Sequence, residues 1–362
     1  MNYNIINIDV KNSMHKNRQF CVNFKDALVC HKDPKEVTYP EVQHVQVIHE
    51  GKEVMMGLDK QLQKVGQRII YKSESIIEEP PADFIEDDVF LLYDNAGENY
   101  IHFFFDMFGR CYYFEELLKN NPNLKLGVLE DFYQEEGRNN FAKQWLDLYL
   151  EDKNIELVIF KKDKKYKVKN LILSNLFYWF PEQYGHEPIL EMIKKVADKI
   201  PPIEVKSNGA YISRQDTIKR GWYHKKELKN EKEFIERVKN DLGYDILEMM
   251  DYTMKEKIQL TKSYKNIIQQ SSASNINILF AAPESNSIIL SNPKMGPWLN
   301  GKCEEFSHTS RSNLLLIDNV GEIVFPPNFK TEDQNNYPWT LTNIDGLIDT
   351  LHQINNNSIW ES

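Results

Sequence analysis

The sequence predicts an α/β protein made of two doubly wound units that face a central cleft, with a β-rich segment in front. From about residue 90, short apolar runs alternate with stretches of helical length, as the strands and helices of a parallel sheet do. The alternation stops at Pro201-Pro202 and Ser207-Asn208-Gly209 and then starts again. A length of 362 residues also suits two domains better than one. The expected parts are an N-terminal domain over 1–200, a second domain over 201–340, and a closing segment over 341–362 that can pack back on the first domain.

The β-rich lead-in covers residues 1–75, where apolar segments alternate with polar turns such as Glu50-Gly51-Lys52. A long apolar helix is expected within Asn95–Asn120, and after it the strand and helix alternation begins. The strands expected in the lead-in are Tyr3–Val10, Phe20–Phe24, Val45–His49 and Glu53–Leu58. Those expected in the rest of the domain are the strands Phe90–Tyr93, Leu124–Leu129, Ile155–Phe160 and Val168–Leu173, with helices at Asn139–Leu150 and Pro188–Lys199.

In the second domain the alternation of short strands with helices starts again, which predicts a second doubly wound unit with a parallel sheet. Ligands of such sheets bind beyond the carboxyl ends of the strands, so candidate binding residues are sought there. The expected strands are Ala210–Ser213, Tyr244–Glu248, Tyr264–Ile268, Ser287–Leu290 and Leu314–Ile317. The expected helices are Asn230–Leu242, Met254–Ser263, Asn275–Phe280 and Ile344–Ile354.

The charge balance narrows the classes of partner. Asp and Glu total 54 against 44 Lys and Arg, a net charge of −10, which argues against a nucleic-acid-binding protein because such proteins carry a basic footprint. A small anionic ligand remains possible, since it needs only a local cluster of positive charge. The basic run Lys161–Lys169 can be a solvated connection or a contact for an anionic membrane surface or acidic glycan.

The cysteines and the apolar runs bear on the compartment. Cys21, Cys30, Cys111 and Cys303 form neither a CxxC pair nor a Cys/His metal spacing, and we expect a reducing compartment, with a Cys21–Cys30 bridge as the open alternative. The N-terminus has no continuous apolar core, so neither a signal peptide nor an anchor is expected. No later run is long enough to span a bilayer. The expectation is a cytoplasmic protein without a membrane span, for which peripheral association stays open.

The apolar helix carries a stripe of four polar residues spaced three or four apart: Asn99, His102, Asp106 and Arg110. At about 100° per residue such positions line one narrow face. Burying a carboxylate and an imidazole without partners is costly, so the stripe points either into an internal ion-pair network or into a wet cleft. For His102 alone, a satisfied core histidine is the plainer interpretation.

A second candidate begins at the strand Tyr211-Ile212-Ser213-Arg214, which is followed by Lys219 and Arg220 and then by Asn230-Glu231. A strand that ends in Ser-Arg places a hydroxyl and a guanidinium at the carboxyl edge of the sheet. Arginine forks suit phosphate oxygens, and a second arginine can hold a diphosphate from the other side. An interdomain salt bridge explains the same residues equally well.

A third candidate is Ile267–Phe280, IIQQSSASNINILF, in which an apolar strand leads through small hydroxyl residues into a helix. Free backbone N–H groups at the start of a helix form an anion site. Serines at such a turn are also common as plain N-caps, so the pattern alone does not decide between the two.

In this order and spacing the three segments resemble glycosyltransferase family 61, over roughly residues 90–295. Members carry Asn-x-x-His-x-x-x-Asp, then a Tyr-Ile-Ser-Arg strand with a later Arg and Asn-Glu, then Glu-Gln-Ile, and last Gly-x-His-Gly-Ala-x-x-x-Asn-x-x-Phe. The matching residues here are Asn99, His102, Asp106, Tyr211–Arg214, Arg220, Asn230, Glu231, Glu256, Ile258, Ala273, Asn277 and Phe280. The departures are Lys257 in the Gln place and Gln269, Ser271 and Ser272 in place of Gly, His and Gly.

The resemblance implies a GT-B architecture of two Rossmann-like domains and an inverting, metal-independent transfer of a hexosyl or pentosyl group. A nucleotide sugar, with a UDP-sugar as the expected donor, would react with a glycan acceptor in surface or capsular polysaccharide synthesis or a related pathway, without a further cofactor. No Asp-x-Asp metal motif occurs in the sequence, so positive side chains would offset the leaving group's charge.

The resemblance also implies roles for single residues. His102 or Asp106 would be the general base, and both assignments stay open. Asn99 and Arg110 are assigned to the acceptor side or the cleft. The donor diphosphate and nucleotide are assigned to Ser213, Arg214, Arg220, Ser271, Ser272, Ala273 and Asn277.

Two other functions stay in view. One is a non-catalytic relative that serves as a partner or scaffold in polysaccharide assembly, because the 269–273 turn departs from the motif. The other is a different nucleotide-dependent α/β enzyme such as an epimerase, which is disfavoured because no GxGxxG follows an expected strand.

Overall fold

The computed structural model divides into two compact units, Met1–Met192 and Ile193–Ser362, and each is described by itself. Some expected features lie outside the part of the chain that the structure describes, namely Arg220, the residues 95–98 and the strand ends at Val10 and Leu58. The described residues are 3–7, 20–31, 45–56, 69–71, 81–93, 99–136, 140–174, 187–215, 227–291, 297–317, 321–323 and 339–356.

The first unit is built on a mixed sheet of order β5-β4-β3-β2-β9-β6-β7-β8, with β1 paired to β2. Only β9, β6, β7 and β8 run parallel, and the strands of the lead-in join them through antiparallel pairing of β2 with β9. The parallel pairing predicted for the strands from about residue 90 on is therefore confirmed, whereas the antiparallel pairing that joins the lead-in to the same sheet was not predicted. The strands are β1 (Tyr3–Asn7), β2 (Phe20–His31), β3 (Val45–His49), β4 (Lys52–Met56), β5 (Ile69–Tyr71), β6 (Asp83–Leu92), β7 (Lys125–Leu129), β8 (Leu157–Phe160) and β9 (Lys165–Ser174).

Two strands of the first unit are longer than the sequence predicts. In β6 only the last four residues are buried, and the leading half is largely exposed. The apolar run that predicted a strand at Phe90–Tyr93 therefore covers only the C-terminal end of β6. In β2 the strand was expected to stop at Phe24, because Lys25 and Asp26 interrupt the apolar pattern. Asp26 adopts a positive φ of 55°, a local irregularity after which the pairing with β9 resumes at Ala27.

The helices of the first unit include one interrupted helix in place of the continuous helix that the sequence predicts. Its segments are α2 (Tyr100–His102), a π-helical turn (Phe103–Met107), a 3₁₀ turn (Phe108–Arg110) and α3 (Cys111–Leu118). The expected helices α4 (Asn140–Leu150) and α5 (Glu187–Asp198) are confirmed, and the end of α5 from Ile193 on belongs to the second unit. Phe114 of α3 lies 5.7 Å from Phe90 of β6, ring centre to ring centre, and so packs this helix on the sheet.

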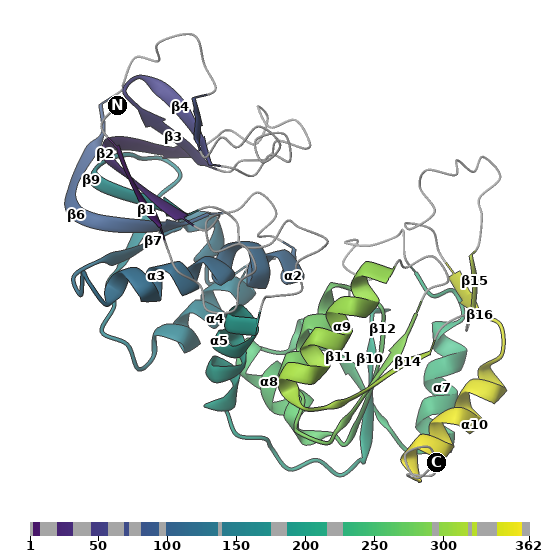
Figure 1. Ribbon diagram of the computed structural model, residues 1–362. Coiled ribbons are helices and arrows are strands. Elements are labelled where there is room, and N and C mark those ends of the chain that lie inside the picture. The colour runs from purple at the N-terminus through teal and green to yellow at the C-terminus, as the bar shows by residue number, and fades with distance from the viewer. Residues whose placement is uncertain are drawn as a thin grey trace, which may run out of the picture. The chain divides into compact units, whose positions relative to one another are not determined.

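The second unit confirms the predicted α/β arrangement, with a fully parallel sheet of order β11-β10-β12-β13-β14. Helices α7 and α10 lie on one face of this sheet, and α8 and α9 lie on the other (Figure 1). The strands are β10 (Gly209–Ser213), β11 (Asp245–Glu248), β12 (Asn266–Gln270), β13 (Asn286–Leu290) and β14 (Asn313–Ile317), with the separate pair β15 (Gly321–Ile323) and β16 (Trp339–Leu341). The helices are α7 (Glu231–Leu242), α8 (Met254–Ser263), the 3₁₀ helix Ala273–Phe280, α9 (Pro297–Ser310) and α10 (Ile344–Asn355).

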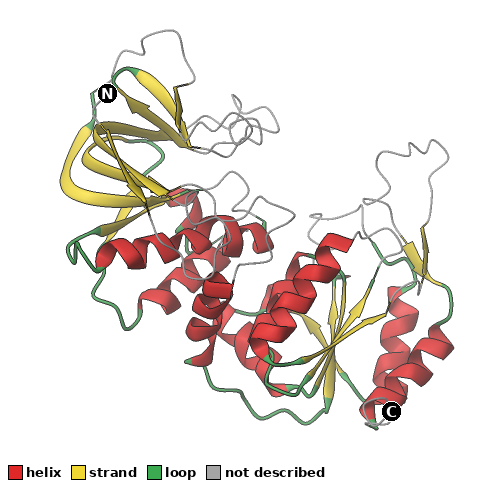
Figure 2. Ribbon diagram, in the orientation of Figure 1, coloured by secondary structure: helices red, strands yellow, loops and turns green. Residues whose placement is uncertain are grey.

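The closing helix α10 belongs to the core of the second unit. Its Leu351 and Ile354 are buried in one cluster with Phe234 of α7 and with Tyr211 and Ile268 of the sheet. The alternative, in which the closing segment packs on the N-terminal domain, receives no support from this core. The long helix α9 was not expected, because its sequence is short of apolar residues and contains a glycine. Figure 2 shows it as one of the helices beside the parallel sheet.

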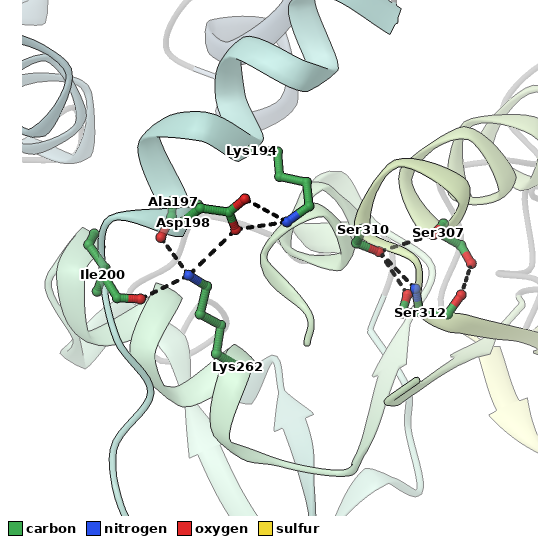
Figure 3. A network of polar contacts seen from close by, with 8 residues as sticks. All are labelled: Lys194, Ala197, Asp198, Ile200, Lys262, Ser307, Ser310 and Ser312. Carbon is green, nitrogen blue, oxygen red and sulfur yellow. Dashed lines mark hydrogen bonds and ion pairs between the residues drawn. The ribbon is translucent and has the colours of Figure 1, made fainter. Parts of the chain in front are cut away.

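The end of α5 is fixed to α8 by a lysine. Lys262 donates hydrogen bonds to the carbonyl oxygens of Ala197 at 2.6 Å and Ile200 at 2.8 Å, and Asp198 lies 3.7 Å from its Nζ (Figure 3). Carbonyls at a helix end have no partner within the helix, and a cation there also interacts favourably with the helix dipole. Burial lowers the pKa of Lys262, and the nearby Asp198 opposes that shift.

Candidate functional site

The first candidate site is the polar stripe, which begins at the N-cap of α2. The Asn99 side chain accepts a hydrogen bond from the backbone N–H of Ile101 at 3.2 Å, so this residue starts the helix. One turn later, His102 Nδ1 lies 2.6 Å from Asp106 Oδ2. The predicted meeting of the imidazole and the carboxylate on one face is therefore confirmed.

The π-helical turn holds this pair in place. The backbone N–H of Phe108 bonds to the carbonyl of Phe103, five residues earlier, and so closes one wide turn around Asp106. Such π turns are rare and occur often at functional sites. The aromatic side chains on the other faces pack in the core, where the ring of Phe104 lies 4.7 Å from that of Trp145 and that of Phe108 lies 5.1 Å from that of Tyr149.

Burial distinguishes the two members of the pair. The side chain of His102 is 27% exposed, whereas that of Asp106 is 2% exposed. The second carboxylate oxygen, Asp106 Oδ1, is buried and has no hydrogen-bond partner among the described residues. A buried carboxylate of this kind stabilises a proton on the imidazole and fixes the orientation of its ring, while the imidazole is the group that solvent reaches.

Arg110 is buried and bonds to the backbone of Asp106. The residue is 1% exposed, and its Nε donates to the backbone carbonyl of Asp106 at 2.9 Å. Its Nη1 donates to the carbonyl and, at 3.3 Å, to the hydroxyl of Ser174 at the end of β9. The guanidinium also stacks 4.4 Å from the ring centre of Tyr93. These contacts tie the turn that carries Asp106 to the carboxyl ends of two strands, and a place for Arg110 in an acceptor cleft stays a prediction.

The second candidate site lies at the carboxyl ends of β10 and β12 and is organised by a carboxylate. Glu231, the first residue of α7, is 1% exposed. Its Oε1 accepts hydrogen bonds from the Tyr211 hydroxyl at 2.8 Å and from Gln270 Nε2 at 2.9 Å. Burial and the neighbouring Glu231 charge raise the pKa of Tyr211 well above its ordinary value, so the phenol stays protonated as a donor.

The same carboxylate also binds the three residues at the end of β10. Its Oε1 accepts from the Ser213 hydroxyl at 3.2 Å and from the backbone N–H of Arg214 at 3.1 Å, and its Oε2 accepts from Gln215 Nε2 at 2.6 Å. Ser213 is itself buried, and Arg214 is partly exposed. The predicted neighbourhood of Ser213 and Arg214 at the sheet edge is present, and their binding of a diphosphate stays a prediction.

The serine turn after β12 is an N-cap in this structure. Ser272 accepts a hydrogen bond from the backbone N–H of Ser274 at 3.3 Å, and its own N–H donates to the Asn275 side chain at 3.1 Å. Ser271 Oγ is buried and has no hydrogen-bond partner among the described residues. Ala273 opens the 3₁₀ helix, and Asn277 is buried within it. The capping interpretation of this turn is thus realised, and a phosphate at the same place stays a prediction.

Within the described ranges, no group of three or more His, Cys, Asp or Glu side chains is arranged to hold a metal ion. Among the described residues there is also no helix with the length and apolar character needed to cross a membrane. All four cysteines are buried and free, so the Cys21–Cys30 bridge does not form.

The two sites fall within a single family match. The profile of Glycosyltransferase 61 matches residues 100–288, which is more than half of the chain and includes both His102 and Glu231. The chain belongs to glycosyltransferase family 61. Membership of a glycosyltransferase family implies two substrates, a sugar donor and an acceptor. Among curated proteins, none matches the chain.

Sequence reasoning missed the part played by Glu231 and Gln270 in this family 61 protein. Glu231 was noted only as a motif position, and Gln270 was not a candidate. An acidic residue in the first turn of a helix is ordinarily an exposed partner of the helix dipole, so nothing in the local sequence marks Glu231 as buried. A polar Gln-Gln pair at the end of an apolar strand was the available signal for Gln270.

Proposed function

We propose that the chain is an inverting glycosyltransferase that moves a hexosyl or pentosyl group from a nucleotide sugar, with UDP-sugar first to be tried, to a hydroxyl of a glycan acceptor. The proposal includes a role in surface or capsular polysaccharide synthesis, carried out in the cytoplasm and without a metal or other cofactor. Membership of family 61 supports the transferase class. The residues of the two sites support the mechanism that follows.

The observation that carries the mechanism is the 2.6 Å contact between His102 and Asp106, together with their unequal exposure. His102 would act as the general base, because it is the member of the pair that solvent and a substrate can reach. Asp106 would hold the ring with Nδ1 protonated and would stabilise the imidazolium after proton transfer. Of the two assignments left open by the sequence, the burial of Asp106 favours this one.

In the proposed step, Nε2 of His102 removes the proton of the acceptor hydroxyl as its oxygen forms a bond to the anomeric carbon. The bond from that carbon to the diphosphate oxygen breaks on the opposite face, and the nucleoside diphosphate leaves with the electron pair. The configuration at the anomeric carbon is therefore inverted. The proton ends on His102 and passes to solvent.

The leaving diphosphate needs compensating positive charge, which we assign to Arg214 and Arg220. Arg214 lies at the carboxyl edge of the parallel sheet, where ligands of such sheets bind. Positioned guanidinium groups stabilise the charge that develops on a leaving phosphate in the way a metal ion would. Ser213, Ser271, Ser272, Ala273 and Asn277 complete the proposed donor side.

Two measurements test the proposal. Purified protein is incubated with nucleotide sugars, and release of nucleoside diphosphate is followed for the wild type and for His102→Ala. The proposal expects turnover that His102→Ala abolishes while the melting temperature is kept. Wild-type turnover that survives in His102→Ala would remove the stripe from the mechanism.

The second measurement addresses the non-catalytic alternative. A ligand that binds the native state raises the melting temperature, so UDP, GDP, CDP and ADP are each tested by thermal shift. A shift with one of them supports a donor site. No shift with any nucleotide, together with no turnover, would favour a scaffold in polysaccharide assembly over an enzyme.

A further inference from the structure

Outside the His102 pair, a second buried carboxylate is that of Glu231. It accepts five hydrogen bonds from two strand ends of the second unit, and four of the five converge on Oε1. A carboxylate placed in a protein interior loses favourable hydration, and that cost is offset only when its oxygens are well bonded. A fully bonded carboxylate therefore fixes the groups around it in one arrangement.

Three consecutive residues at the end of β10 are fixed in this way. The Ser213 hydroxyl and the Arg214 backbone N–H bond to Oε1, and the Gln215 amide bonds to Oε2. Ser213 Oγ in turn accepts from the backbone N–H of Gln215 at 3.1 Å, which closes the turn around Arg214. The backbone of Arg214 is thus held from both sides, and its direction on leaving the strand is set by Glu231.

The other partners of Glu231 connect this turn to the neighbouring strand. Gln270, the last residue of β12, donates through Nε2 both to Glu231 and to the Tyr211 hydroxyl, each at 2.9 Å. Both acceptors require the amide nitrogen on this side, so the orientation of the Gln270 amide is determined. Strands β10 and β12 are neighbours, whereas β11 lies on the other side of β10, so this is the switch point of the sheet, where ligands bind.

The charge of Arg214 lies close to this network. The Arg214 guanidinium lowers the pKa of Tyr211, against the larger effects of burial and of Glu231 that raise it. A cation within electrostatic reach of the Tyr211 hydroxyl is also within reach of the carboxylate to which that hydroxyl is bonded. Glu231 thus bonds to the backbone N–H of Arg214, and the charge of Arg214 acts on the same Tyr211 hydroxyl that donates to Glu231.

We propose that Glu231 is a positioning residue for the donor, acting through Arg214 to present a guanidinium to the diphosphate of the nucleotide sugar. This inference rests on the donor role of Arg214 under the proposed function. Glu231 itself touches no substrate. Its carboxylate sets the end of β10 before the donor arrives, which lowers the ordering cost of binding.

The variant Glu231→Gln tests this with almost no change in side-chain volume. One acceptor oxygen becomes an N–H₂ group that faces hydrogen-bond donors, so the turn around Arg214 loosens. Nucleotide affinity is measured by calorimetry with UDP, or with the tightest of UDP, GDP, CDP and ADP. A loss of roughly 10- to 150-fold is expected for Glu231→Gln, as for a lost charge-assisted bond. Glu233→Gln, the same change at an exposed position of the same helix, is the control and is expected to leave affinity unchanged.

A double-mutant cycle separates positioning from a merely structural role. If Glu231 acts through Arg214, then Glu231→Gln costs nothing further once Arg214→Ala is present, and the two losses are not additive. The donor KM should rise while the acceptor KM stays constant. Additive losses, or equal changes in both KM values, would overturn the inference and leave the proposed function standing. An Arg214→Ala variant with unchanged nucleotide affinity would instead overturn the donor role and the inference together.

A second variant covers the case in which Glu231→Gln does not fold. Tyr211→Phe removes one donor to the carboxylate and one acceptor of Gln270 but keeps the ring, which packs 5.2 Å from that of Phe234. The same cycle with Arg214→Ala is then measured, and a loss of about 2- to 5-fold is expected, again absent on the Arg214→Ala background. A loss that persists on that background would refute the positioning role.

Discussion

Replacement of Asp106 by asparagine is the sharpest test of the mechanism, because it removes a charge and leaves the shape of the side chain. The carboxylate lies 2.6 Å from His102 Nδ1, a short distance typical of a charge-assisted hydrogen bond. Such a bond contributes about 1.5–3 kcal/mol, and it is strongest in the transition state, where the imidazole gains a proton. The turnover number of Asp106→Asn should therefore fall about 10- to 150-fold.

The stability of the same variant should behave differently. Asp106 is 2% exposed, and its Oδ1 has no hydrogen-bond partner among the described residues, so the native protein carries the cost of burying this charge. A neutral amide relieves part of that cost, and the free energy of unfolding should stay within about 1 kcal/mol of the wild-type value or rise. Lost activity without lost stability is the expected signature of a functional residue.

The assay is steady-state release of nucleoside diphosphate at saturating donor and acceptor, with urea unfolding of the same samples. Asp147→Asn is the matched control, since Asp147 is a helical aspartate of the same unit that bonds Lys143 and Tyr133, each at 2.6 Å, on a part-exposed face. It should keep full turnover. Full turnover in Asp106→Asn, or a loss of turnover that parallels a loss of stability, would refute the reasoning.

Three further predictions concern the fold. Hydrogen bonds from Thr253 lower the pKa of Glu256 in the folded protein. The stability that Glu256 contributes is therefore present above its ordinary pKa of 4.5 and is lost as the pH falls through the lower folded value. In urea unfolding from pH 7 to pH 3, Glu256→Gln should lack this pH-dependent contribution, and its unfolding free energy should converge with that of the wild type in acid. A Cβ on Gly209 would overlap with the Tyr244 ring, so Gly209→Ala should destabilise by about 1–3 kcal/mol in the same assay, and an unchanged midpoint would contradict this. Lys262→Met leaves two carbonyls at the end of α5 without their donor and should lower the unfolding free energy by about 1–3 kcal/mol, which hydrogen exchange should localise to the end of α5.

The parallel sheet of the second unit was the most predictable part of the fold. Each of the strands β10, β12 and β13 has five residues, all of them buried, and each contains adjacent apolar residues that mark it in the sequence. The first unit was less predictable. In β9 the leading half is partly exposed and lysine-rich, and its antiparallel pairing with β2 joins segments far apart in the chain, which no local pattern reveals.

The stripe was predictable because a single π-helical turn leaves residues three or four apart on the same face of the helix. Asn99, His102 and Asp106 were expected on one face of a regular helix, and the face exists although the helix passes through a π turn at Phe103–Met107. The π turn itself was not predictable, because its five residues are as apolar as the helix around them. The residue types of the site were predictable from their spacing, whereas which of them are buried depends on tertiary packing.

The two candidate sites have a buried carboxylate in common. In each unit a carboxylate that is almost fully buried bonds to a partly exposed residue: Asp106 to His102 in the first, and Glu231 to the backbone of Arg214 in the second. A buried charge stabilises a fold weakly, since apolar packing of the same volume does as well or better, so its presence at two positions calls for another explanation. Orientation of a reactive or binding group is that explanation, because a well-bonded carboxylate fixes direction as well as charge. If this is right, neutral isosteres at both positions should leave the fold intact, yet each should remove a different function: the acceptor step for Asp106 and donor affinity for Glu231.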